Sequence, residues 1–272
     1  MAQNIYDQPA FFEGYSSLPR SVQGLAGAAE WESVRALLPD LKGRRVVDLG
    51  CGFGWFARYA ADEGAASVLG LDLSENMIAR AKAETQSPAV RYEIADIDHL
   101  KLPAGGFDFA YSSLAFHYIA DFDRLVRTIH AALVPGASFV FTIEHPLYMA
   151  PSQPDWAEIG GRTVWPVDGY LVEGPRTTDW LAKGVVKYHR TLGTTLNALI
   201  AAGFAIRHVE EWRPSEAQLA EHPEWQIELN RPMFLLIACE RAESLERQAA
   251  TLYAGFWRAR TMIVEPFAGI TI

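Results

Sequence analysis

At residues 46–54 the chain carries the run Val46-Val47-Asp48-Leu49-Gly50-Cys51-Gly52-Phe53-Gly54. Its first four residues are mostly apolar, as expected of a short strand buried on both faces of a parallel sheet. The three glycines that follow let the backbone turn sharply and let a ligand approach closely. A helical pattern with Phe56, Tyr59 and Ala60 comes next and ends at Gly64. A strand, a glycine loop and a helix in this order form a ligand site beyond the carboxyl end of the strand.

A second strand and helix follow directly. The strand is expected at residues 68–71, with Asp72 at its carboxyl end and Ser74 placed to cap a helix that carries Met77. Further strands are expected at 90–96, 107–111 and 138–143, and a further helix at 121–133. Strands that alternate with helices predict a mainly parallel sheet with right-handed crossovers.

The end of the expected sheet breaks this alternation. A helix is expected at 191–202, closed by Gly203, and strands at 204–211 and 233–239. Because no helix of comparable length joins these two strands, they should pair antiparallel. The pattern therefore predicts an α/β fold with a Rossmann-like, doubly wound, mainly parallel seven-stranded sheet whose last strand is antiparallel.

Four segments organise the chain. Residues 1–42 predict an N-terminal helical cap, and residues 43–241 the main domain. Within that domain, residues 145–187 are rich in Pro, Gly and Trp without a clear period, which is typical of an insert over the binding face of the sheet. Residues 242–272 form a C-terminal extension, which is expected to be helical to about Arg260.

Composition excludes several classes of partner. The formal net charge of −9, without any cluster of Lys or Arg, makes nucleic acid an unlikely substrate because the surface repels polyanions. No apolar run reaches membrane-spanning length, so no membrane partner is expected. Cys51 and Cys239 offer neither a disulfide framework nor a paired-cysteine zinc pattern. With no secretory pattern in the first 14 residues, we expect a cytoplasmic location.

The glycine loop and its surroundings resemble the class I S-adenosylmethionine-dependent methyltransferases, of the type-11 kind, over about residues 45–239. The resemblance rests on Val46 to Gly54, Gly70-Leu71-Asp72-Leu73-Ser74, Ala95-Asp96-Ile97, Phe107-Asp108 and Leu133-Val134-Pro135-Gly136. It implies S-adenosylmethionine as cofactor, S-adenosylhomocysteine as its product, and transfer of a methyl group to an O or N atom of a small molecule without a metal.

This resemblance also implies a set of cofactor-binding residues. Gly50 and Gly52 would line the methionine portion, Asp72 would accept both ribose hydroxyls, and Asp96 with Ile97 would hold the adenine edge. The full expected set is Asp48, Gly50, Cys51, Gly52, Asp72, Leu73, Met77, Asp96, Ile97 and Ser113. Asp48 has two interpretations: it orients the loop by accepting backbone hydrogens, or it contacts the ligand directly.

Three histidines are candidates for a catalytic role. His117 follows the fourth strand, His145 ends the fifth beside Glu144, and His189 enters the next helix. A general base is needed only when the acceptor carries a proton that must leave. The structural alternative for each is a hydrogen-bonded residue in the wall of a cleft.

Aromatic side chains are expected to hold the acceptor. The candidate substrate residues are Tyr6, Phe12, Tyr15, Arg20, Trp165 and Tyr188. The aromatics of the cap and insert form either a lid that excludes water or a subunit interface, in which case the chain is a homodimer.

Two other functions use parts of the same pattern. An NAD(P)-dependent oxidoreductase also has a glycine loop and a strand-end acid, but Trp55 stands where the dinucleotide fingerprint has Gly or Ala. A non-catalytic module that binds S-adenosylmethionine would keep the cofactor site without acceptor chemistry.

Overall fold

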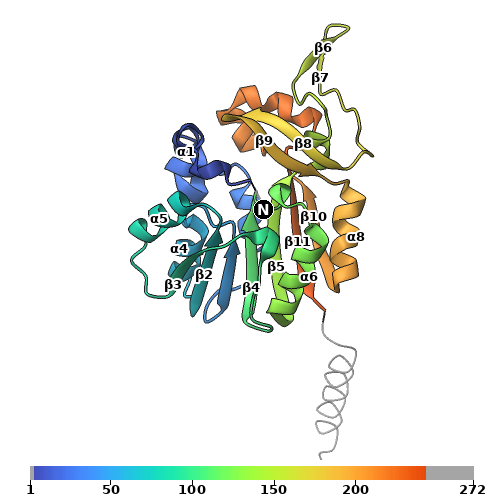
Figure 1. Ribbon diagram of the computed structural model, residues 1–272. Helices are drawn as coiled ribbons and strands as arrows, with labels where there is room; N and C mark the ends of the chain where they lie inside the picture. The colour runs from blue at the N-terminus through green and yellow to red at the C-terminus, as the bar shows by residue number, and fades with distance from the viewer. Residues whose placement is uncertain (1–2, 243–272) are drawn as a thin grey trace, which may run out of the picture. The chain divides into compact units, whose positions relative to one another are not determined.

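Seven strands form the central sheet, in the order β10-β11-β5-β4-β1-β2-β3 (Figure 1). The computed structural model describes residues 3–242 of the chain. The strands are β1 Arg45–Leu49, β2 Ser67–Asp72, β3 Val90–Ile94, β4 Phe107–Ser113, β5 Leu133–Glu144, β10 Phe204–Glu211 and β11 Phe234–Arg241. Strands β1 to β5 pair in parallel, and β11 is antiparallel to both β5 and β10. The predicted fold, with its antiparallel last strand, is confirmed.

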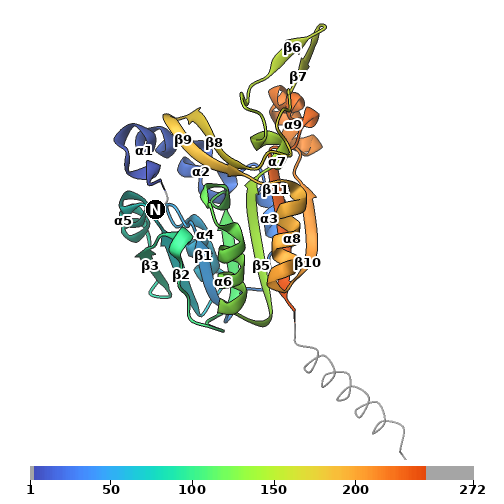
Figure 2. The same ribbon diagram turned by 45° about the vertical axis from the view of Figure 1, so that its right-hand side comes forward.

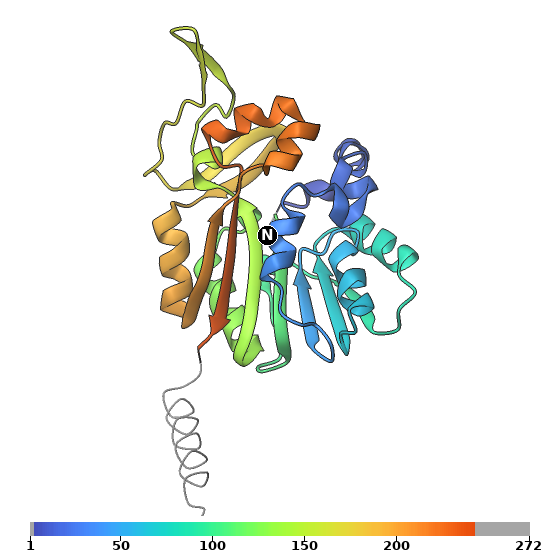
Figure 3. The same cartoon turned by 180° about the vertical axis from the view of Figure 1, so that it is seen from behind.

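Helices cover both faces of this sheet. They are α3 Trp31–Leu37, α4 Trp55–Asp62, α5 Glu75–Glu84, α6 Phe122–Ala132 and α8 Leu192–Ala202. Helices α6 and α8 pack on one face, and α3, α4 and α5 on the other (Figures 1 and 3). Each face has its own apolar core, so β1, β4 and β5 are buried on both sides, as their sequences predicted.

Two predicted strand boundaries differ from the structure. Strand β3 ends at Ile94 instead of residue 96, because the Asp96 carboxylate accepts the Asp98 N–H and caps the short 3-10 helix Ile97–His99. Strand β5 begins at Leu133, before the predicted turn at Pro135-Gly136. That turn is an irregularity within the strand, since the pairing register with β4 shifts there.

The N-terminal residues form the predicted helical cap. Its elements are the 3-10 helices Ile5–Asp7 and Gly24–Gly27 and the helices α1 Pro9–Ser16, α2 Pro19–Val22 and α3. Ile5 and Phe11 bury their side chains against Val185, which belongs to the insert. The cap and the insert therefore share a small apolar core.

The insert contains two antiparallel hairpins, which the irregular sequence pattern did not predict. The elements are α7 Pro146–Met149, β6 Ala157–Ile159, β7 Arg162–Val164, β8 Gly174–Trp180 and β9 Ala182–His189. Hairpin β8–β9 lies over the carboxyl-end edge of the central sheet, and hairpin β6–β7 projects beyond it (Figures 1 and 2). Because β9 continues to His189, the insert extends two residues past its predicted end.

Short helices join β10 to β11, as expected. They are α9 Glu216–Glu221 and the 3-10 helix Pro223–Asn230. The helix predicted to run to about Arg260 lies outside the described residues. No helix within residues 3–242 has the length and apolar character needed to cross a membrane.

Candidate functional site

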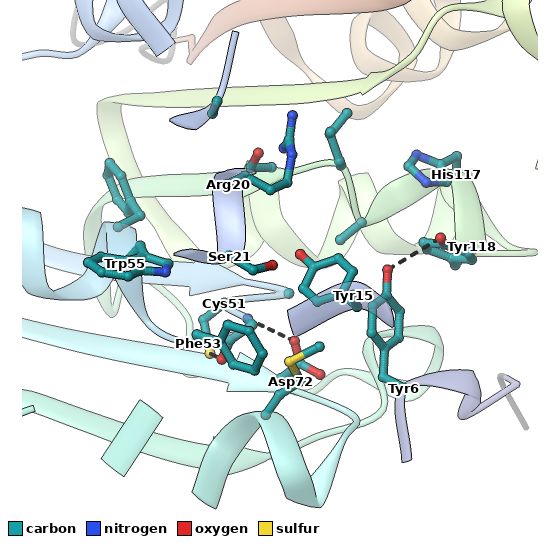
Figure 4. A pocket seen from close by; sticks show the side chains of 18 of the residues that line it. Tyr6, Tyr15, Arg20, Ser21, Cys51, Phe53, Trp55, Asp72, His117 and Tyr118 are labelled. Carbon is teal, nitrogen blue, oxygen red and sulfur yellow. Dashed lines mark hydrogen bonds between the residues drawn. The ribbon is translucent and has the colours of Figure 1, made fainter. Parts of the chain in front are cut away.

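A cavity of about 300 Å³ lies at the carboxyl ends of β1, β2, β4 and β5 (Figure 4). Its size falls at the lower end of the range for small-molecule sites. All ten residues expected to bind a cofactor line it: Asp48, Gly50, Cys51, Gly52, Asp72, Leu73, Met77, Asp96, Ile97 and Ser113. The structure therefore brings this set together in one pocket.

The three glycines of the loop serve different purposes. Gly50, Gly52 and Gly54 all have positive φ, between 52° and 76°. A Cβ on Gly50 would lie 2.4 Å from that of Ala115, and one on Gly54 would lie 2.2 Å from the Tyr92 hydroxyl. A Cβ on Gly52 would have no atom within 4 Å, so this position faces open space in the pocket. Gly50 and Gly54 permit close packing, and Gly52 leaves room for a ligand.

Asp72 is held rigidly at the end of β2. Its Oδ2 accepts the Gly52 N–H (Figure 4), and its Oδ1 accepts the Ser74 N–H, both at 2.9 Å. Burial raises the pKa of this carboxyl, while the two backbone donors act in the opposite direction. Each oxygen keeps a second lone pair, so the group can still accept the two hydroxyls of a cis-diol.

One carboxylate oxygen of Asp48 is buried and unpaired among the residues that the structure describes. Within residues 3–242 its Oδ2 has no hydrogen-bond partner. Burial raises the pKa of Asp48 to about 8, and the charge of Asp72 adds to this effect. A backbone hydrogen bond with Ala57 opposes the shift, which agrees with a loop-orienting role. A cationic ligand beside Asp48 would favour its ionised form, so the site fits a sulfonium better than a phosphate.

Trp55 lies beside the glycine loop and forms part of the pocket wall. Its ring abuts Gly24 of the cap, where a Cβ would come within 2.5 Å of the ring. The Arg58 guanidinium covers the ring at 4.5 Å from the centroid. The helix α4 therefore begins with a large side chain that packs against the cap and lines the pocket.

The backbone between β4 and the following turn is strained. Leu114 adopts φ of 52°, an uncommon conformation for a residue with a branched side chain. Its N–H donates to the Thr142 carbonyl of β5 at 2.9 Å, which holds this conformation. Ser113, Leu114 and Ala115 all line the pocket, so the strain lies at the site itself.

His117 also lines the pocket and is buried. Burial lowers the pKa of His117 well below its usual value, and the charges of Lys187, Arg190 and Arg20 add to the effect. Its Nδ1 accepts the Glu144 N–H at 3.4 Å, which places the ring proton on Nε2. Nε2 lies 4.0 Å from Glu144 Oε1.

Glu144 lines the pocket, although the sequence indicated it only as the neighbour of His145. It ends β5, and its Oε1 accepts the Lys187 ammonium of β9 at 2.5 Å. Its Oε2 is buried and has no hydrogen-bond partner in the described part of the chain. The available signal was its position, since an acid that ends a buried strand lies on the binding edge.

The other two candidate histidines do not line the pocket. His145 caps helix α7, where its Nδ1 accepts the Leu147 N–H, and its Nε2 lies 2.9 Å from Glu211. His189 Nε2 lies 2.8 Å from the Tyr170 carbonyl in the base of the insert. His145 therefore serves as a helix cap, and His189 forms a hydrogen bond within the insert.

The substrate candidates divide in the same way. Tyr6, Tyr15 and Arg20 line the pocket, while Phe12, Trp165 and Tyr188 do not. Tyr6 and Tyr118 are joined by a hydrogen bond between their hydroxyls at 3.3 Å (Figure 4).

The three residues outside the lining have other contacts. The ring of Phe12 packs on Phe53, which lines the pocket, with their centroids 5.8 Å apart. Trp165 donates to the Leu147 carbonyl, and Tyr188 pairs with Pro175 in hairpin β8–β9. No group of three or more metal-ligating side chains occurs in the part of the chain that the structure describes.

Comparisons with known proteins agree with this geometry. A family model described as a methyltransferase domain matches residues 47–141. A solved S-adenosylmethionine-dependent methyltransferase from Mesorhizobium loti is 62% identical, with a TM-score of 0.78, and the match covers 80% of this chain and all of that one. A protein of uncharacterised function from Haemophilus influenzae is 34% identical over 88% of this chain and 98% of its own length. A trans-aconitate 2-methyltransferase from Deinococcus radiodurans is 36% identical over 51% of this chain and 55% of its own length, so the likeness spans about half of each protein.

Proposed function

Because this chain belongs to the class I S-adenosylmethionine-dependent methyltransferases, we propose that it methylates an oxygen or nitrogen atom of a small molecule. The observation that carries the proposal is the shared cavity. The glycine loop, Asp72, His117 and Glu144 all line this one cavity. Cofactor and acceptor would therefore meet within one enclosed space.

Each of the expected cofactor-binding residues would contact a different part of S-adenosylmethionine. Asp72 would bind the ribose hydroxyls, and Asp96 with Ile97 the adenine edge. Gly50 and Gly52 would leave room for the methionine portion, and Asp48 would face the positive charge. Leu73, Met77, Cys51 and Ser113 would supply packing around the nucleoside and the sulfur.

Rate acceleration in this site would come mainly from alignment and the exclusion of water. S-adenosylmethionine supplies a methyl group on a sulfonium, which transfers by in-line displacement. The cap and hairpin β8–β9 would keep water out, because they share a core beside the pocket. Tyr6, Tyr15 and Arg20 would contact the acceptor, and His117 would orient groups around it as a neutral ring.

The small size of the acceptor is supported by the cavity and by charge. The cavity of about 300 Å³ would have to hold the cofactor as well, which leaves room for only a small acceptor. The net charge of −9 disfavours nucleic acid. The trans-aconitate methyltransferase named above acts on a small molecule, and we propose a small-molecule acceptor for this chain as well.

The domain organisation follows from the same proposal. Residues 1–42 would act as a cap, 43–241 as the methyltransferase domain, and the insert 145–187 as a substrate lid. Both cysteines are buried and free, which agrees with a cytoplasmic location. Homodimer formation is a further proposal, to which the projecting hairpin β6–β7 would contribute.

The proposal is tested by incubating the protein with cell extract and a methyl donor labelled in the methyl group. Mass spectrometry should find the label in one or a few small molecules, and S-adenosylhomocysteine should accumulate. The absence of a labelled product, with cofactor binding intact, would instead indicate a non-catalytic binding module. Tight binding of NAD would contradict the proposed cofactor.

A further inference from the structure

Glu144 occupies an unusual position for a carboxylate. It lines the pocket at the end of β5, and its side chain is 14% exposed. One oxygen, Oε1, is held by the Lys187 ammonium at 2.5 Å. The Glu144 backbone N–H donates to His117 Nδ1, so that side chain and main chain are both fixed.

The second oxygen of Glu144 has no hydrogen-bond partner in the described part of the chain. Oε2 is buried, and no donor within residues 3–242 reaches it. Burying an ionised oxygen away from water without a new hydrogen bond costs more free energy than burying a neutral oxygen in the same way. A donor supplied by a bound molecule would remove that cost.

The surroundings restrict what this donor can be. Lys187 already neutralises the charge of Glu144, and its ammonium lies 5.0 Å from the Trp180 ring centroid and 5.9 Å from that of Tyr118. A carboxylate placed at Oε2 would meet another carboxylate oxygen and would carry no hydrogen to donate. An amine, alcohol or phenol carries that hydrogen.

We propose that Glu144 Oε2 anchors the methyl acceptor through an N–H or O–H group, so that the acceptor is an amine, alcohol or phenol and not a carboxylate. This inference rests on the proposed function, since it assigns the acceptor side of the same pocket. Lys187 and His117 hold Glu144 in place. Tyr118 and Tyr148 line the pocket near it.

The chemistry balances with this assignment. A lone pair on the acceptor nitrogen or oxygen forms a bond to the methyl carbon. The carbon–sulfur bond breaks, and its electron pair remains on sulfur. The acceptor proton passes to Glu144 Oε2 and from there to water, which restores the carboxylate.

Three probes with the same skeleton test the preference directly: 3-phenylpropylamine, 3-phenylpropanol and 3-phenylpropanoate. Each is titrated calorimetrically into protein that is saturated with S-adenosylhomocysteine. We expect the amine and the alcohol to bind at least about tenfold more tightly than the carboxylate, which corresponds to about 1.4 kcal/mol. Equal or tighter binding of the carboxylate overturns the inference, as does failure of both the amine and the alcohol to bind at about 10 mM.

Glu144→Gln tests whether this residue causes the preference. The variant keeps the size of the side chain, and Glu211→Gln is the matched control, because Glu211 pairs with a buried histidine away from the pocket. We expect the amine preference to disappear in the first variant and to persist in the second. An unchanged preference in Glu144→Gln overturns the role of Glu144.

Failure of this inference can be distinguished from failure of the proposed function. If S-adenosylhomocysteine does not bind, the proposed function fails and the inference fails with it. If it binds and the probes show the opposite preference, only the inference fails. If Glu144→Gln does not fold, the three titrations with the unmodified protein still decide the acceptor class.

Discussion

At the scale of single residues, Gly52 and Glu144 mark what a sequence pattern can and cannot predict. The glycine loop was predictable because three glycines after an apolar strand have few other uses. Of the three loop glycines, only Gly52 faces open space. This could not be predicted, because it depends on Ala115 lying against Gly50 and Tyr92 lying against Gly54 in the folded chain. Glu144 was predicted only as a partner of His145, because residue type alone does not tell which of two adjacent residues faces the pocket.

Asp48 gives a prediction for proton release. With a pKa of about 8, roughly nine-tenths of this carboxyl is protonated at pH 7 in the free protein. A bound sulfonium would favour the ionised form, so binding of S-adenosylmethionine should release close to one proton at pH 7. Calorimetry in buffers of different ionisation enthalpy measures this number.

The control for that experiment is Asp48→Asn, which should abolish the release. S-adenosylhomocysteine, which lacks the sulfonium charge, should release fewer protons than S-adenosylmethionine. The affinity for S-adenosylmethionine should also rise as the pH increases from 6 toward 8. Equal proton release from the variant would contradict the role of Asp48.

The same shift predicts how Asp48 affects folding. Its folded pKa lies above the value of 3.8 expected when it is unfolded, so the folded state binds more protons between these values. Folding stability should therefore fall as the pH rises from about 4 through 8, and Asp48→Asn should flatten this dependence. Urea unfolding at several pH values tests the slope.

At the scale of elements, helix α5 depends on a residue far away in sequence. The Asp7 carboxylate of the cap accepts the Glu75 and Asn76 N–H groups at 3.1 Å and the Ser74 hydroxyl at 2.5 Å. Sequence analysis predicted that Ser74 caps this helix, and its hydroxyl does accept the Met77 N–H. The contribution of Asp7 could not be predicted, because it depends on how the cap folds back over the sheet.

Asp7→Ala should therefore weaken both the helix and the cap. Loss of a capping carboxylate typically costs about 0.5–2 kcal/mol. Burial alone would raise the pKa of Asp7. Its hydrogen bonds with Ser74 and Asn76 outweigh this effect, so the net shift of the pKa is downward. The contribution is thus present above the unfolded pKa and is lost as the pH falls through the folded value.

Chemical denaturation of the two proteins at pH 7 and at about pH 2 measures this effect, the lower pH being below the usual carboxyl pKa. The difference between Asp7→Ala and the parent should be clear at pH 7 and nearly absent at the acidic pH. Asp40→Ala serves as a control, since Asp40 is exposed and lies outside helix α5. A difference that persists at acidic pH would show that the carboxylate charge is not the cause.

At the scale of residues 3–242 as a whole, the number and direction of the strands followed from the sequence, while the covering of the site did not. Alternating strands and helices, and the lack of a long helix between β10 and β11, were enough to predict a mainly parallel sheet with an antiparallel last strand. Hairpin β6–β7 is short and largely exposed, so it shows no apolar period. Strand β9 does alternate in burial, but two of its buried positions hold Lys187 and His189, so its sequence lacks an apolar alternation. Its contact with the cap joins residues far apart in the chain, which local patterns do not encode.

The shared core of cap and hairpin predicts local opening. Phe11→Ala would remove a fully buried ring from the cluster with Ile5 and Val185. A Phe→Ala change in a core typically costs about 3–5 kcal/mol. Hydrogen exchange should accelerate in residues 3–18 and 174–189 and remain slow in β1 and β4. Uniform acceleration across the sheet would instead show that this core is part of one cooperative unit.

Binding of S-adenosylhomocysteine by the parent protein and by Asp72→Ala, measured by calorimetry, tests the central claim most directly. The parent protein should bind S-adenosylhomocysteine, and Asp72→Ala should bind it about 10- to 100-fold more weakly. This factor corresponds to the loss of about 1.5–3 kcal/mol that is typical of a charged hydrogen bond. Asp108→Ala, which loses an ion pair with Arg45 at the far end of β4, should bind normally. Equal affinity in Asp72→Ala, or no binding by the parent protein, would contradict the assignment of this pocket to the adenosyl cofactor.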